Sequence, residues 1–220
     1  MARTYTHLIP LGLATLLLAL TPGCQRMYYG TMGAFGYEKR DILVDRVESA
    51  RDEQEDAKEQ FTSALEQFKS VVDFDGGDLE DMYDKLEREY ERSKSASSDV
   101  SGKIDSVDKV AQALFTEWEG ELEEYDSAEL RAASENQLKT TRKRYGQMLD
   151  AMRKAEATMP PVLTAMNDQV LFLKHNLNAQ AVASIQGTAE GIQRDITSLI
   201  EQMQVSIDEA NAFIDQMGGG

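Results

Sequence analysis

The sequence predicts an all-α protein: an elongated antiparallel helical bundle or coiled coil of three to four long helices. Apolar residues recur at alternating spacings of four and three, which places them along one stripe of a helix. Short segments rich in Gly, Asp or Pro separate these stretches. The composition agrees, because 28% of residues are charged and only 7% are aromatic, as is typical of long helices.

The first helix is expected at about 37–73. Its apolar seam has one polar member, Gln54, and otherwise consists of Leu43, Val47, Ala50, Ala57, Phe61, Ala64, Phe68 and Val71. Asp75-Gly76-Gly77-Asp78 then ends the helix, because Gly favours a helix exit and Asp78 can cap the next helix. Short connections of this kind make consecutive helices antiparallel neighbours.

The second helix is expected at about 78–125, with a seam from Leu79 to Tyr125 that is polar at Ser93 and Ser97. Asp126-Ser127 marks the following turn. A third apolar stripe, Leu130, Leu138, Thr141, Tyr145, Met148, Met152, Ala155 and Met159, continues from there.

Pro160-Pro161 leaves two readings of the remaining chain. Either the prolines open a fourth helix, or they kink one helix that turns near residues 176–178. We favour the first reading, because proline is well tolerated in a first helical turn. It gives helices at about 128–158 and 161–217 within one bundle domain, 37–217, and a disordered tail at 218–220.

The N-terminus has the pattern of a bacterial lipoprotein signal peptide over residues 1–23. Arg3 is followed by an apolar run from Leu8 to Leu20 and then by Gly23-Cys24. This run of about 13 residues is too short to span a membrane as a helix. We therefore expect cleavage before Cys24 and lipidation of its sulfur, with residues 24–36 forming a lipidated, Gly- and aromatic-rich tether. Plain secretion and an uncleaved anchor are the alternatives, since Thr21-Pro22 departs from the usual lipobox.

Several kinds of chemistry are disfavoured by the residues present. The net charge of −16 opposes binding to nucleic acid. Cys24 is the only cysteine, which excludes an internal disulfide and a thiolate metal cluster. His175 is the only histidine after residue 23 and has no partner base or nucleophile in a recognisable motif. We expect no enzyme activity, no metal and no cofactor other than covalent lipid on Cys24.

One basic stretch stands out in this acidic chain: Lys139, Arg142, Lys143 and Arg144. In an up-and-down bundle it is level with the start of the first helix, where Asp41 and Asp45 lie, so interhelical ion pairing is the first expectation. The alternative is contact with an anionic envelope component, such as a lipid headgroup or a cell-wall polymer.

Four segments resemble a known family: 28–32 (YYGTM), 35–44 (FGYEKRDILV), 74–79 (FDGGDL) and 169–179 (QVLFLKHNLNA). The chain is similar, over residues 24–217, to bacterial lipoproteins catalogued as domain of unknown function 2959. The resemblance implies a Gram-negative envelope protein and supplies no catalytic residues and no established activity. Gln25 after Cys24, in place of Asp, implies sorting to the outer membrane.

The sequence thus predicts a non-enzymatic envelope lipoprotein that faces the periplasm from the outer membrane and acts as a helical scaffold or partner-binding protein. The alternative is a ligand-binding or envelope-sensing module that recognises an anionic envelope component through the basic stretch. The expected partners are membrane lipid, through the anchor, and an envelope protein or cell-wall component. A homo-oligomer is left open, because heptad seams can close within one chain or between chains.

Overall fold

The computed structural model describes residues 39–72, 79–176 and 179–218. These residues form α2 (Lys39–Val72), α3 (Leu79–Glu121), the 3₁₀ turn η1 (Leu122–Glu124), α4 (Ala128–His175) and α5 (Ala179–Gly218). All of these elements belong to one compact unit, Glu38–Gly220. The predicted signal peptide, Cys24, the tether and the Asp75–Asp78 turn lie outside the described residues. Among the described helices, none is long and apolar enough to cross a membrane.

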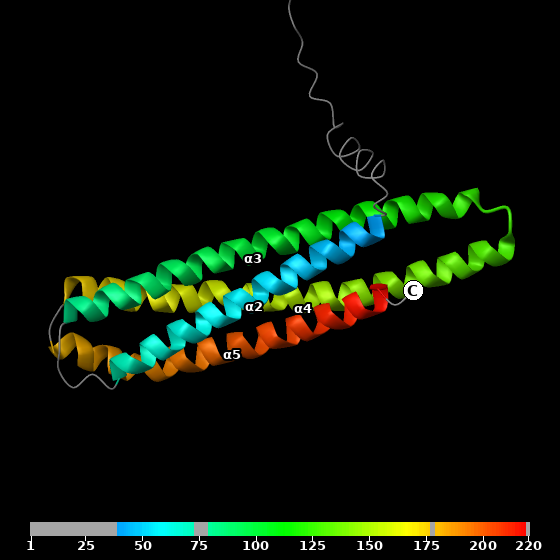
Figure 1. The fold of residues 1–220 in the computed structure, drawn as a ribbon. Coiled ribbons are helices and arrows are strands. Elements are labelled where there is room, and N and C mark those ends of the chain that lie inside the picture. Colours follow the sequence, from blue (N-terminus) through cyan, green and yellow to red (C-terminus); the bar gives the residue numbers. More distant parts are fainter. Residues whose placement is uncertain (1–38, 73–78, 177–178, 219–220) are drawn as a thin grey trace, which may run out of the picture. The chain divides into compact units, whose positions relative to one another are not determined.

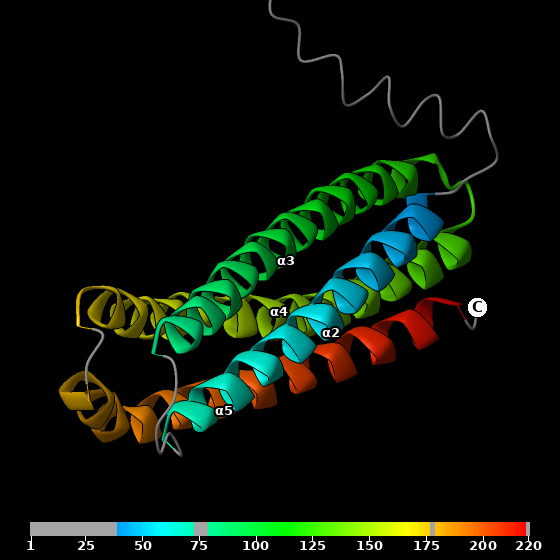
Figure 2. The same ribbon diagram turned by 60° about the vertical axis from the view of Figure 1, so that its left-hand side comes forward.

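The four helices form a closed ring, which confirms the predicted all-α antiparallel bundle. α2 packs against α3 and α5, and α4 also packs against α3 and α5. Figures 1 and 2 show successive helices running in opposite directions, with α2 and α4 diagonal to each other across the bundle. Each helix therefore has two neighbours that cover its apolar stripe.

The core follows the predicted seams. In α2 the seven apolar seam residues with a described side chain are fully buried: Leu43, Val47, Ala50, Ala57, Phe61, Ala64 and Phe68. The core continues along α4 with Met148, Met152, Met159 and Met166, and along α5 with Ile185, Ile196, Leu199 and Met203. Methionine fills irregular gaps between long helices because its side chain is unbranched and flexible.

The expectation that Pro160-Pro161 opens a fourth helix was wrong. Both prolines lie inside α4, which continues to His175. Their side chains are exposed, whereas Met159 and Val162 beside them are buried, so the rings face outward from the core. Proline removes two backbone donors there, and on an exposed face the freed carbonyl groups can be hydrated. Uninterrupted burial of the apolar stripe holds the helix together across the two prolines.

The seam has a buried polar pair where α2 meets α5. Ser206 Oγ donates a 2.8 Å hydrogen bond to Gln54 Oε1, and neither side chain is exposed. Gln54 Nε2 is buried and has no partner among the described residues. The pair joins residues far apart in sequence at one level of the bundle, so it favours a single register of α2 against α5.

The double substitution Pro160→Ala/Pro161→Ala should raise the free energy of unfolding, by as much as about 3 kcal/mol, because proline is strongly unfavourable inside a helix. Urea unfolding measures the change. The matched control Lys154→Ala, at an exposed position of the same helix, should change stability by less than about 0.5 kcal/mol. A loss of stability in the double variant would instead favour prolines that begin a helix.

Ser206→Ala should destabilise the bundle by about 1–3 kcal/mol, because it leaves the buried Gln54 Oε1 without a donor. Adding Gln54→Met removes the Oε1 and Nε2 atoms of Gln54, which lack partners in Ser206→Ala, and keeps a similar side-chain volume. The double variant should therefore recover most of the lost stability. Urea unfolding of the two single variants and the double variant tests this coupling. Additive effects would contradict it.

Candidate functional site

The basic stretch on α4 is partly neutralised by the protein itself. Arg142 donates a hydrogen bond to Glu119 of α3, and its guanidinium lies 5.1 Å from the centre of the Phe115 ring. Lys139 pairs at 2.6 Å with Glu135 on its own helix. The Arg142 guanidinium also holds the pKa of the Glu119 carboxyl below its usual value. The predicted interhelical pairing is therefore confirmed for Arg142.

The predicted position of the partner carboxylate was wrong. The basic stretch was expected to face the start of the first helix, but α2 is diagonal to α4 in the ring. The acidic partners come from α3, because that helix adjoins α4 along its length. Arg153 follows the same rule, since it reaches Asp105 of α3 at 2.7 Å and Glu156 of its own helix at 2.9 Å.

Lys143 and Arg144 are exposed and do not share a face of α4. Arg144 borders a small cavity of about 40 Å³ together with Glu209 and Phe213 of α5. Lys143 is one helical position, about 100°, away from Arg144 and turns toward solvent. Lys139, Arg142 and Lys143 are spaced three and four residues apart and share one face of α4, whereas Arg144 lies on the side that borders α5, so the four basic residues do not form one cluster.

An aromatic cluster under the basic stretch connects three helices. The Tyr145 ring lies 5.4 Å from the Phe115 ring and 6.3 Å from the Phe213 ring, both edge-on. The Tyr145 hydroxyl donates a 2.8 Å hydrogen bond to Asp108. Burial and this bond to a carboxylate raise the pKa of Tyr145 well above its ordinary value. Tyr145 is therefore a neutral structural donor at physiological pH.

A second feature is the hairpin between α3 and α4, which extends past the other two helices. α2 begins at the level of Glu117, where Lys39 pairs with that residue, and α5 ends beside α2, where Arg40 donates to the Met217 carbonyl. Figure 1 shows the hairpin continuing beyond these two ends. We call residues 116–137 the overhang. No residue in it is buried.

The overhang exposes apolar side chains among acidic ones. Leu130 is 59% exposed and Tyr125 is 41% exposed, although both belong to the predicted seams. The carboxylates there are Glu117, Glu119, Glu121, Glu123, Glu124, Asp126, Glu129 and Glu135, with Arg131 as the single cation. Trp118 Nε1 donates a 2.8 Å hydrogen bond to Ser134 Oγ, which ties the two arms together.

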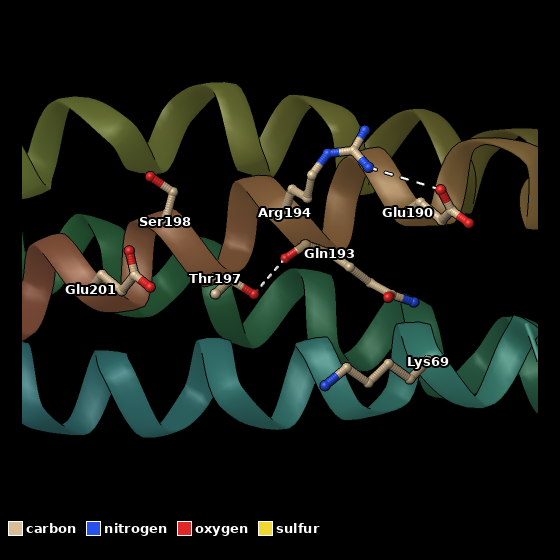
Figure 3. Close-up of a pocket in the computed structure, with 7 residues that line it drawn as sticks. All are labelled: Lys69, Glu190, Gln193, Arg194, Thr197, Ser198 and Glu201. Atoms are coloured by element: carbon tan, nitrogen blue, oxygen red, sulfur yellow. Dashed lines mark hydrogen bonds and ion pairs between the residues drawn. The ribbon is translucent and has the colours of Figure 1, made fainter.

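A shallow depression of about 410 Å³ lies on the outer face of α5 beside Lys69 of α2. Figure 3 shows Arg194 directed toward Glu190, with which it pairs at 3.9 Å, while Thr197 bonds to the Gln193 carbonyl of its own helix. Glu201 lines the same depression, so two cations and two carboxylates balance each other. This arrangement selects neither an anion nor a cation.

Metal-ligating side chains do not gather in the described part of the chain. No group of three or more His, Cys, Asp or Glu side chains there could hold a metal ion. His175 lies exposed in the last turn of α4. Lys174 beside it places a cation in the last turn, where it interacts favourably with the helix C-terminus.

Sequence reasoning missed the overhang as a surface. Its apolar residues continue the 4-3 spacing of the two seams and were therefore counted as core. A signal was present in the unequal predicted lengths of the first two helices: at 1.5 Å per residue, the helix expected at about 78–125 is roughly 72 Å long and the one expected at about 37–73 is roughly 55 Å long. A ring of unequal helices must leave part of the longer ones uncovered.

The sequence profile of a family described as a protein of unknown function (DUF2959) matches residues 28–217. The chain therefore belongs to this family, as the resemblance predicted. No curated protein matches the sequence significantly, and no solved structure does.

Arg142→Gln should raise the pKa of Glu119 toward its ordinary value, because the charged donor that lowers it is gone. A lowered carboxyl pKa in the folded state stabilises the fold above the unfolded pKa, and this contribution is lost as the pH falls below about 4.3. The variant should therefore lose less stability than wild type below that pH. Carboxyl-detected NMR titration measures the pKa, and Lys143→Gln is the matched control, which should leave Glu119 unchanged.

Proposed function

We propose that this member of the DUF2959 family is a non-enzymatic envelope lipoprotein, anchored through Cys24 and acting as a periplasm-facing helical scaffold or partner-binding protein. The observation that carries the proposal is the placement of the chain's one cysteine after an apolar run of signal-peptide length. A helical bundle starting at Lys39 then supplies the part that meets partners.

The described bundle supports a binding role better than a catalytic one. Its described interior is apolar apart from Gln54, Ser93, Thr141 and Ser206. Its charged groups lie on the surface, where many pair with neighbours on the same or the adjacent helix. Catalysis needs titratable groups held together in a water-excluding cleft, whereas binding to a partner needs only an accessible, shaped surface.

The alternative, recognition of an anionic envelope component through the basic stretch, receives weaker support. Arg142 and Lys139 already pair with Glu119 and Glu135. An anion would have to compete with these carboxylates, or bind Lys143 or Arg144 singly. Single exposed cations give little affinity, because the exposed pairs they form are worth at most about 1 kcal/mol each.

The anchor can be tested in cells that express the full chain. Wild type should incorporate radiolabelled palmitate and fractionate with the outer membrane, whereas Cys24→Ser should lose the label. Gln25→Asp should keep the label and move to the inner membrane. Wild type without lipid, or equal labelling of wild type and Cys24→Ser, would overturn the proposal.

A further inference from the structure

Among the residues that the structure describes, no helix covers one face of the overhang. Along the bundle, α2 covers α3 and α5 covers α4, but both end at the start of the overhang. On α4, Gln137 and Leu130 lie seven and fourteen residues before Arg144, respectively, so they share its face, the side that borders α5. On α3, Glu121 lies one turn after Glu117, which faces α2. Two more helices would therefore fit against this face, in line with α2 and α5.

The space beside this face has the dimensions of the overhang itself. The α4 arm, residues 128–137, is about 15 Å long at 1.5 Å per residue. A second copy of the chain carries an identical pair of helices with an identical uncovered face. If two copies meet antiparallel about a twofold axis, each overhang fills the space left by the partner's short helices. The four-helix cross-section is then continued through both copies.

The helix ends that meet in this arrangement are complementary in charge. The second copy's α3 ends in Glu121, Glu123 and Glu124 and would approach the start of α2, which carries Lys39 and Arg40. The C-terminus of one helix, partially negative, thus faces the partially positive N-terminus of another. The start of α4 likewise approaches the end of α5 with opposite partial charges.

We propose that the overhang is a self-association surface, on which a second copy of this chain packs antiparallel with Leu130 and Tyr125 in the contact. A merely basic partner would match the carboxylates by charge without filling the space above Leu130, whereas a second copy brings a helix pair to that space and acidic helix ends to the start of α2, and does so twice. The inference goes beyond the proposed function, because it requires neither lipid nor an envelope partner.

Neighbouring alanines provide a matched test of this geometry. Ala133 lies near the middle of the α4 arm on the same side as Leu130 and Gln137, and Ala132 is turned outward; both are exposed. In the purified full chain carrying Cys24→Ser, the introduced cysteine is the only thiol. Under mild oxidation, Ala133→Cys should form a disulfide-linked dimer, whereas Ala132→Cys should stay monomeric. Crosslinking suits a contact of this size, since small interfaces are weak.

The charge contribution is tested in the Ala133→Cys background. Glu121→Lys/Glu124→Lys should lower the crosslinked fraction roughly fivefold, because two exposed ion pairs per contact are reversed. The control Glu59→Lys/Glu66→Lys changes two exposed residues of α2 and alters the net charge equally. If general repulsion between acidic chains decided association, both variants would crosslink more than the parent. Circular dichroism shows whether each variant keeps its helix content.

Preferential crosslinking at position 133, suppressed by the changes at Glu121 and Glu124 alone, supports the proposal. Equal crosslinking at 132 and 133, no crosslinking at either, or no effect of the charge reversal overturns it. When the same variant is oxidised in an envelope extract, crosslinking from position 133 to a different protein and not to a second copy also overturns it and points to a hetero-partner. None of these outcomes depends on lipidation of Cys24, so this experiment and the test of the proposed function can fail independently of each other.

Discussion

Closure of four apolar seams on one another is the constraint on which the rest of the structure depends. A long amphipathic helix is marginal in water by itself and gains its stability from the packing of its apolar face. In this bundle α2, α3, α4 and α5 each obtain that packing from two neighbours. The fully buried residues Phe61, Ile104, Met152 and Ile196 show that all four contribute to one core.

The same ring determines which polar groups meet. Because α2 and α4 are diagonal, the cations of α4 pair with carboxylates of α3, as Arg142 and Arg153 do. Inside the ring, Gln54 of α2 accepts a hydrogen bond from Ser206 of α5 at the same level. Such buried bonds are costly to leave unmade, so they favour one register of helices that could otherwise slide.

Much of this fold could be predicted from the sequence, because heptad spacing reports directly which side of a helix is buried. The ends of the helices were harder. Pro160 and Pro161 break the local rule for helices, yet α4 continues, since its apolar stripe stays buried on both sides of them. The carboxylate partner of Arg142 depends on ring order, which no single helix encodes. Leu130 matches the seam pattern and is nevertheless exposed, because burial also requires a neighbour at that level.

The acidity of the chain limits where association can occur. Two copies with a net charge of −16 repel each other at long range, so contact requires local complementarity that outweighs this repulsion at close range. Most of the described surface alternates charges that pair within the chain, and such pairs leave little to attract a partner. At the overhang, uncovered apolar groups, acidic helix ends and the basic start of α2 occur together. These three features coincide because two helices of the ring are shorter than the other two, so the difference in length that leaves the seam uncovered also creates its binding surface.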